Sequence, residues 1–209
     1  MGASSIKDGI LTSIKTDNPT MLSHYLNELV PNDYINSSKT FTCLNICASF
    51  GGIKCCSLLI TKGWRVDQPE KEKGNSPLLL SIKFGYEDLT KKLIKEYKAN
   101  INYVNYAKLN CLDCAIVYSR YSIAYFLIYE LGMKICKSIT QYKEIMLLND
   151  IYMYQIEPFY NNLLMKQKET NEVENDGNIL NITERNETFN DNMSIVDIDK
   201  IMVSVDKKK

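Results

Sequence analysis

Two pairs of cysteines have a spacing that suits metal binding. Cys43 and Cys47 stand four residues apart, and Cys111 and Cys114 stand three residues apart. Four thiolates form many structural zinc sites, with each sulfur about 2.3 Å from the metal. A fold that brings the two pairs together would give the chain a zinc site, and a fold that separates them would leave core thiols.

Two other residues could support catalysis: the single histidine, His24, and Ser76, which follows a glycine by two positions. A catalytic histidine needs a nucleophile or an orienting carboxylate beside it, and the sequence around His24 places none there. The chain has no phosphate-binding loop, dinucleotide fingerprint or zinc-protease motif. We therefore predict that it is not an enzyme and takes no cofactor or small-molecule substrate.

The composition suits one packed domain with a tail. The chain has 209 residues, of which 45% are hydrophobic, and a formal net charge of zero. Residues 1–166 carry 19 basic against 15 acidic side chains, and residues 167–209 carry 6 against 10. No basic stripe indicates nucleic-acid binding, and no apolar run is long enough to span a membrane. Without a secretory signal, we expect a cytoplasmic protein with reduced thiols.

The elements that must position these side chains repeat every 34 residues. The segment 76–78, Ser-Pro-Leu, aligns with 42–44, Thr-Cys-Leu, and with 110–112, Asn-Cys-Leu. Thr42, Ser76 and Asn110 are all good N-cap residues, and Pro77 suits the first position of a helix. Apolar residues then recur at helical spacing, first before and again after a glycine at Gly51 and Gly85. Each unit therefore predicts two short helices, and Gly63 and Gly132 end two of the second helices.

This pattern resembles the ankyrin repeat. The residues of one unit that match the family pattern are, in order, Gly74, Ser76, Pro77, Leu78, Gly85, Leu93, Ile94, Ala99 and Asn102. The family's histidine after leucine is missing, and Asn45, Leu79 and Asp113 stand in its place. The resemblance implies an all-α solenoid of helix-turn-helix units, joined by short hairpin loops, that binds other proteins.

The repeat register argues against zinc. Cys43 and Cys111 occupy equivalent positions two units apart, and stacked helices lie about 8–10 Å apart. The two pairs of thiols are then separated by roughly 20 Å, which is too far for one metal ion. We predict that these thiols are core side chains.

The predicted ankyrin-repeat domain covers residues 1–168. It holds five units, 5–36, 37–69, 70–104, 105–138 and 139–168. In the first unit, Asn18 and Pro19 begin a helix. In the last, Ile145, Leu148, Ile151 and Tyr152 form an apolar stripe, and Pro158 opens the final helix.

The tail, residues 169–209, is acidic, rich in asparagine and predicted to be mostly disordered. One part of it has helical periodicity, since Ile195, Ile198, Met202 and Val205 are spaced by 3, 4 and 3 residues. Either this segment never folds, or residues 193–206 fold against a partner or against the solenoid.

Three aromatic residues, Phe50, Phe84 and Tyr118, are also 34 residues apart, each at the end of a first helix. The resemblance places this position on the concave face, where ankyrin repeats contact their partners. We call these three residues the aromatic row. The row, together with Lys83, either forms a binding surface or consists of rings that only pack against the neighbouring repeat.

The hairpin tips are the second predicted contact region. One tip is charged, residues 70–73, and is expected to be solvated, whereas the next holds Tyr103 and Tyr106, which offer contact area at low entropic cost.

Lysine outnumbers arginine 22 to 3 and asparagine is abundant. We attribute this to codon bias and therefore draw nothing from single asparagines.

The N-terminal sequence Met-Gly-Ala-Ser-Ser-Ile-Lys partly matches an N-myristoylation signal, although Ile6 stands where serine or threonine is usual. The main functional prediction is a non-enzymatic adaptor, scaffold or inhibitor that is monomeric alone and binds a partner protein. The alternative is a structural component of a larger complex, acylated at Gly2 and weakly associated with membranes.

Overall fold

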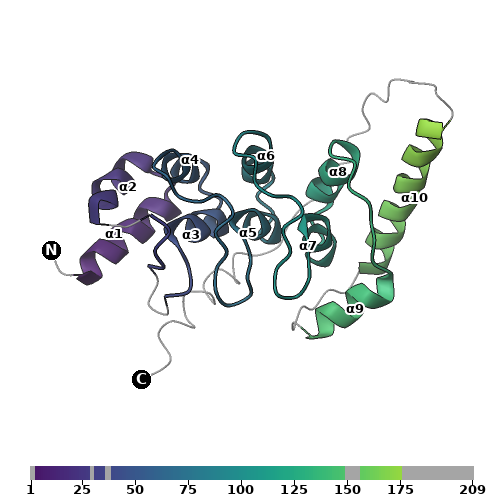
Figure 1. Ribbon diagram of the computed structural model, residues 1–209, viewed down its shortest axis with the longest axis horizontal. Coiled ribbons are helices and arrows are strands. Elements are labelled where there is room, and N and C mark those ends of the chain that lie inside the picture. The colour runs from purple at the N-terminus through teal and green to yellow at the C-terminus, as the bar shows by residue number, and fades with distance from the viewer. Residues whose placement is uncertain (1–2, 29–30, 36–38, 149–155, 176–209) are drawn as a thin grey trace.

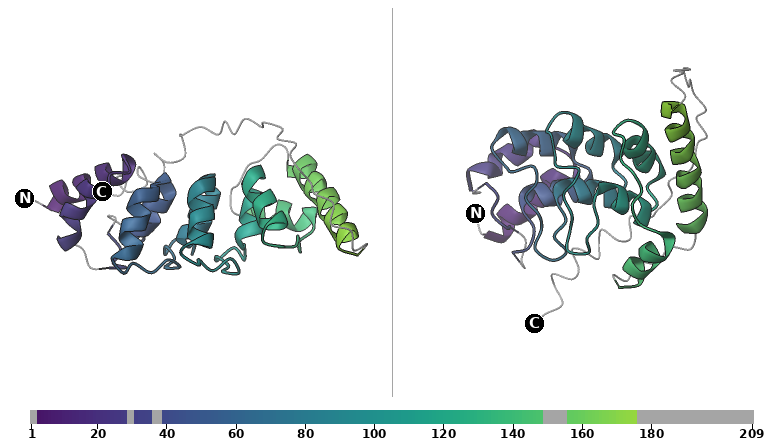
Figure 2. Two further views of the ribbon diagram at one scale, coloured as in Figure 1. Left: turned by 90° about the horizontal axis from the view of Figure 1, so that it is seen from above. Right: turned by 45° about the vertical axis from the view of Figure 1, so that its right-hand side comes forward.

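The computed structural model describes residues 3–28, 31–35, 39–148 and 156–175, which form pairs of helices stacked side by side (Figure 1). The helices are α1 (Ala3–Lys15), α2 (Pro19–Tyr25), η1 (Leu26–Glu28), α3 (Cys43–Phe50), α4 (Ile53–Thr61), α5 (Pro77–Lys83), α6 (Glu87–Lys95), α7 (Cys111–Val117), α8 (Tyr121–Tyr129), α9 (Ile139–Leu148) and α10 (Ile156–Asn175). Seen from above, the pairs follow one another from α1 and α2 at one end to α10 at the other (Figure 2). The predicted all-α solenoid is confirmed.

The first helix of each central unit begins at the predicted N-cap. The backbone N–H of Asn45 donates to Thr42 Oγ1 (3.2 Å), that of Leu79 to Ser76 Oγ (3.3 Å), and that of Asp113 to Asn110 Oδ1 (2.9 Å). In two units the side chain at the third helical position returns the bond. The N–H of Thr42 donates to the amide oxygen of Asn45, and the N–H of Asn110 donates to the carboxylate of Asp113. Two of the departures from the family pattern are thus capping-box residues.

The core lies between the helix pairs. Leu44, Leu78 and Leu112, at equivalent positions of the three inner helices, are at most 1% exposed. The inner helices α3, α5 and α7 pack in one row, and each also packs against the outer helix of its own unit. This leucine row is part of one hydrophobic cluster that runs through the helix pairs, and burial of that cluster stabilises the stack.

The turn between the two helices of a unit is covered by a side chain of the next unit. Gly51 has a φ of +72°, and a Cβ added there would lie 2.5 Å from the ring of Tyr86. At Gly85 the covering residue is Arg120, whose Nη2 and Nε donate to the carbonyl of Lys83 at 2.6 and 3.0 Å. These glycines allow both a left-handed turn and close contact with the following unit.

The hairpins that join the units are tied to one another through the backbone. The N–H of Lys71 donates to the carbonyl of Thr40, and the N–H of Tyr106 donates to the carbonyl of Lys73, both at 3.0 Å. In Figure 1 these hairpins project on one side of the helices.

Glu70 is buried at the base of the hairpin 70–75, with an exposed fraction of 1%. Its carboxylate accepts backbone N–H groups from Glu72 (2.6 Å), Lys73 (3.0 Å) and Asn75 (2.9 Å), and also the side-chain amide of Asn75 (2.9 Å). The expectation that this charged tip is solvated is therefore wrong for Glu70. The tight turn directs several N–H donors inward, and a buried carboxylate satisfies them.

The last helix pair differs from the central ones. Its first helix, α9, begins at a capping box formed by Ser138 and Gln141. Asp113 of α7 accepts hydrogen bonds from Lys137 Nζ (2.5 Å) and from the buried hydroxyl of Tyr142 (2.8 Å), which fastens α9 to the stack. Burial, followed by the charge of Asp113, raises the pKa of Tyr142 above its ordinary value.

Two details predicted for this end are wrong. Leu148 is 81% exposed, because it is the last residue of α9 and has no helix packed over it among the described residues. The final helix begins at Ile156, two residues before Pro158. Proline is tolerated there because the first turn of a helix leaves its N–H groups without intrahelical partners. Ile151, Tyr152, Gly2 and residues 176–209 lie outside the described residues.

We expect Glu70→Gln to lower the free energy of unfolding by about 2 kcal/mol, because an amide nitrogen would then face backbone donors in a buried site. Urea denaturation followed by circular dichroism measures this. Glu72→Gln is the matched control, since Glu72 is exposed and its amide would still accept the hydroxyl of Thr40. Equal midpoints for the two variants would refute the role assigned to Glu70.

Candidate functional site

The aromatic row lies at the C-terminal ends of the inner helices. Phe50 is the last residue of α3, and Phe84 and Tyr118 are the C-cap residues of α5 and α7. Each of the three side chains is half-buried, so each ring packs against the core on one side and retains an accessible part. The row is therefore anchored by the stack without being enclosed by it.

Lysine ammonium groups lie over the rings. Lys83 Nζ is 5.3 Å from the centroid of Phe84 and 5.5 Å from that of Tyr118, and it thereby joins two units. Lys15 Nζ lies 5.6 Å from the centroid of Phe50. Cation–π contacts at such sites are worth about 0.5–1 kcal/mol each. The inclusion of Lys83 in the predicted surface therefore has a geometric basis, namely its contact with two members of the row.

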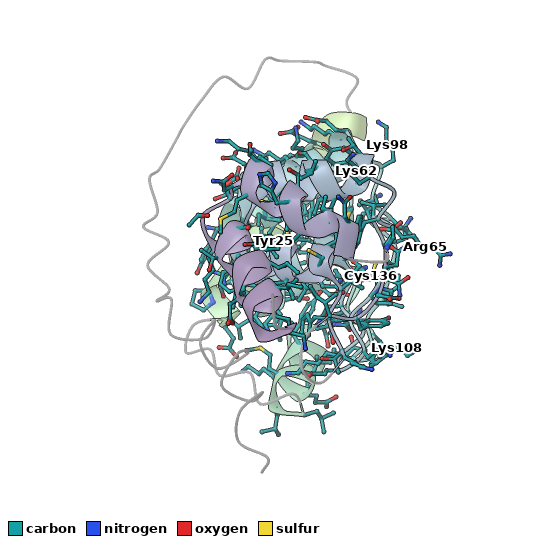
Figure 3. All side chains as sticks on the ribbon, turned by 90° about the vertical axis from the view of Figure 1, so that its left-hand side faces the viewer. Tyr25, Lys62, Arg65, Lys98, Lys108 and Cys136 are labelled. Atoms are coloured by element: carbon teal, nitrogen blue, oxygen red, sulfur yellow. The ribbon has the colours of Figure 1, made fainter. Side chains whose placement is uncertain are left out.

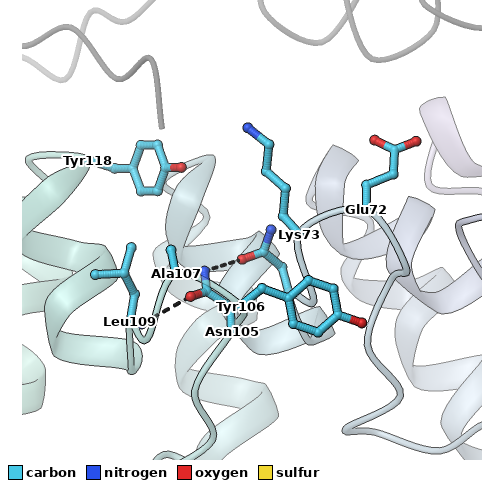
Figure 4. A pocket seen from close by; sticks show the side chains of 8 residues that line it. Glu72, Lys73, Asn105, Tyr106, Ala107, Leu109 and Tyr118 are labelled. Atoms are coloured by element: carbon cyan, nitrogen blue, oxygen red, sulfur yellow. Dashed lines mark hydrogen bonds between the residues drawn. The ribbon is translucent and has the colours of Figure 1, made fainter. Parts of the chain in front are cut away.

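A shallow pocket of about 280 Å³ extends from the row to the hairpin tips (Figure 4). Its lining residues are Glu72, Lys73, Asn75, Asn105, Tyr106, Ala107, Leu109 and Tyr118. We call it the hairpin pocket. It brings Tyr118 of the row and Tyr106 of the tip onto one surface, although 12 residues separate them in the sequence.

The base of the hairpin pocket is held by buried amides. Asn105 Nδ2 donates to Asn75 Oδ1 (2.8 Å), and the N–H of Leu109 donates to Asn105 Oδ1 (3.0 Å). Through Asn75 this chain of hydrogen bonds continues to Glu70. Sequence reasoning missed both asparagines. The only sequence feature that could have indicated them is a polar residue at the base of each of two successive hairpins.

The two predicted tip tyrosines have different roles in the structure. Tyr106 is 64% exposed, and its ring packs on Gly74, where an added Cβ would lie 2.6 Å away. Tyr103 is half-buried and donates its hydroxyl to the carbonyl of Gly74 at 2.9 Å. Burial, with a smaller effect of Tyr106, raises the pKa of Tyr103 above its ordinary value. Tyr106 thus offers a contact surface, and Tyr103 supports the turn beneath it.

The comparison with protein families agrees with this geometry. A family model described as ankyrin repeats (3 copies) matches residues 13–105 and, in a second match, residues 44–138. The chain belongs to the ankyrin-repeat family. The curated proteins include no significant match to it. The two family matches together contain the aromatic row and the hairpin pocket, so both lie on recognisable ankyrin repeats.

The residues considered for catalysis serve the ankyrin fold or lie on its surface. Ser76 is fully buried, and its hydroxyl accepts the N–H of Leu79 as a helix cap. His24 is exposed on α2, in the first helix pair. Viewed along the stack, Lys62, Arg65, Lys98 and Lys108 project toward one side (Figure 3). Lys62 and Arg65 come from one repeat, and Lys98 and Lys108 come from the two that follow it.

The thiols gather within a repeat rather than between repeats. Cys47 contacts the thiols of Cys43, Cys55 and Cys56, all fully buried, whereas Cys111 and Cys114 lie two repeats away in α7. The prediction of core thiols is confirmed, and the grouping with Cys55 and Cys56 was missed. Within the described residues, no group of three or more histidine, cysteine or acidic side chains is placed to hold a metal ion.

Burial suppresses the reactivity of these thiols. It raises the pKa of Cys47 and of Cys114 well above the ordinary value, and it raises the pKa of Cys111 to about 12. Only a thiolate is strongly nucleophilic or binds metal well. These groups therefore remain protonated core side chains at neutral pH.

We expect the stability of the protein to fall as the pH rises above about 9. Unfolded thiols ionise near their ordinary pKa of 9.0, whereas the folded thiols stay neutral, so the unfolded state gains stability by about 1.4 kcal/mol per pH unit per thiol. Urea denaturation in reductant at pH 7.5, 9 and 10 measures the slope. Cys111→Ser should reduce the slope of unfolding free energy against pH by the contribution of one buried thiol. Cys136→Ser, which changes an exposed thiol, should leave the slope unchanged. The same slope in both variants would contradict this account.

Proposed function

We propose that this ankyrin stack is a non-enzymatic adaptor, scaffold or inhibitor that binds a partner protein across the aromatic row and the hairpin pocket. Ankyrin repeats are in general protein–protein interaction modules, and their family is typically non-enzymatic. The observation that carries the proposal for this chain is the continuity of three half-buried rings in register with a pocket that ends at the exposed Tyr106.

The energetic case rests on preorganisation. The helix caps, the hairpin hydrogen bonds and Lys83 hold the rings before a partner arrives, so binding loses little conformational entropy at this surface. Aromatic side chains are common among the residues that dominate binding energy at interfaces. A partner that covers the accessible part of each ring gains apolar burial without having to order it.

The polar groups beside the pocket support binding rather than catalysis. Asn75 and Asn105 bond to each other, Asn75 also donates to the carboxylate of Glu70, and Asn105 accepts the N–H of Leu109, so their hydrogen-bonding capacity serves the fold. Tyr106 and the edges of the rings supply apolar contact, and Lys73 supplies charge at the rim. Such a surface suits a polypeptide that brings its own apolar side chains.

Phe84→Ala combined with Tyr118→Ala should reduce partner capture from a native lysate at least tenfold, because two adjacent hot-spot rings are removed. Quantitative mass spectrometry of proteins retained by the tagged chain measures this. Tyr129→Ala is the matched control, since it removes an exposed aromatic ring from outer helix α8.

The double variant must remain folded for the comparison to be informative. Circular dichroism should show a folded protein, and urea denaturation should show a loss of about 3–5 kcal/mol, because one fully buried ring is worth about that much and the two rings removed are each half-buried. Global unfolding, or equal capture by the double variant and the Tyr129 control, would contradict the proposal. Either result would mean that the rings only pack between neighbouring repeats and do not form a binding surface.

The alternative function, an acylated component of a membrane-associated complex, remains a prediction because Gly2 lies outside the described residues. Within the described residues no helix is long and apolar enough to cross a membrane. One myristoyl chain alone binds membranes only marginally. An acylated form would therefore depend on a protein partner to stay at a membrane, which the same binding surface would supply.

For this alternative, mass spectrometry of the N-terminal peptide from cells that express the chain naturally should show Gly2 with a mass increase of one myristoyl group. Gly2→Ala is the control, since the acyltransferase requires glycine at this position. An acetylated or unmodified Gly2 would exclude the alternative and would leave the main proposal unaffected.

A further inference from the structure

The row and the hairpin pocket carry more positive than negative charge. The charged residues that contact the rings or line the pocket are Lys15, Lys73, Lys83 and Glu72. Lys83 Nζ lies over the rings of Phe84 and Tyr118, so a segment that covers these rings meets an apolar surface beside an ammonium group. This combination specifies an acidic and apolar occupant.

We propose that the chain's own C-terminal segment, residues 193–206, occupies the part of this surface formed by Phe84, Lys83, Tyr118 and the hairpin pocket when no partner is bound. The inference rests on the proposed function, because it assigns a competitor to the same binding surface. A partner protein must then displace the segment, which makes the tail a regulator of binding.

The sequence of the segment matches the chemistry of the surface. Residues 193–206 carry three acidic side chains against one basic side chain, and three lysines, 207–209, follow the segment. At 100° per residue, Ile195, Ile198 and Met202 fall on one face of a helix, and Asp199 and Asp206 fall along one flank of that face. An apolar face flanked by carboxylates is complementary to aromatic rings flanked by ammonium groups.

The connection from α10 is long enough. The ring of Phe159 in α10 lies 4.1 Å from the ring of Tyr121, three residues after Tyr118. From Phe159 to Asn175, where α10 ends, the helix rises by about 24 Å. The 17 residues from 176 to 192 span up to about 60 Å when extended. The segment can therefore reach Tyr118 and Phe84.

Tethering makes weak binding sufficient. A short covalent connection between a segment and its binding site gives an effective concentration on the order of 1 mM. A segment that binds with a Kd of about 0.1 mM would then occupy the surface about 90% of the time. A partner would bind about tenfold more weakly than it binds a surface without the segment.

Photo-crosslinking in the full chain tests the proposal. With Phe84→p-benzoylphenylalanine and the protein at low micromolar concentration, irradiation should give a crosslink within one molecule to a peptide from residues 193–206. The same label at Tyr129 on α8 should not give this product. Asp199→Lys with Asp206→Lys, or 0.5 M NaCl, should lower the yield at least fivefold.

The matched control is Glu184→Lys with Glu187→Lys, which makes the same charge change in the connecting residues and should change the yield less than twofold. The absence of an intrachain crosslink to 193–206 would overturn the proposal, as would crosslinks found only at dimer mass, which would make a second copy the occupant. Partner capture by the Phe84 and Tyr118 alanine variant is measured separately. Lost capture without the intrachain crosslink would keep the proposed function and remove only the tail as occupant.

Discussion

The stack depends on satisfying backbone hydrogen-bond donors where each hairpin turns into a helix. Its inner helices have only seven or eight residues, and isolated helices below about 12–15 residues are marginal in water. Thr42, Ser76 and Asn110 cap these helices, and Glu70 and Asn105 take up the N–H groups of the hairpins that precede two of them. The leucine row can pack only because these junctions fix the direction in which each helix begins.

The position of the aromatic row follows from the same constraint. A C-terminal residue of a short inner helix cannot be fully enclosed, because the chain turns immediately toward the outer helix. A large ring there rests on the core and keeps one edge accessible, as Phe50, Phe84 and Tyr118 do. Lys83 adds a contact that crosses the boundary between two units. The accessible edges of the three rings thus follow from the length of the inner helices.

The repeating part of the fold could be predicted from the sequence because its causes are local. The 34-residue period, the N-caps and the glycine turns are all set by residues within one unit. The positions of Phe84 and Tyr118 on one side followed from that period. The buried state of Glu70 could not be predicted, since a Glu-Lys-Glu-Lys sequence normally indicates a solvated turn, and only the tertiary fold shows how many N–H groups point inward there.

The hairpin pocket and the last helix pair depend on contacts between units. Asn105 was passed over because asparagine is abundant throughout the chain, and its bond to Asn75 crosses 30 residues. The attachment of α9 through Asp113, Lys137 and Tyr142 likewise joins residues of different units. Leu148 fits an apolar stripe by spacing alone, but spacing does not reveal where the stack stops covering it.

The coverage of Gly51 by Tyr86, and of Gly85 by Arg120, has a consequence for how the protein unfolds. In both of these repeats a side chain of the C-terminal neighbour covers the turn, so a repeat whose neighbour has unfolded loses the contact over its own turn. Melting should therefore spread more readily toward the N-terminus than toward the C-terminus. The coupling between adjacent repeats is directional, which gives this one-dimensional array a polarity that its nearly uniform helix pairs would not suggest.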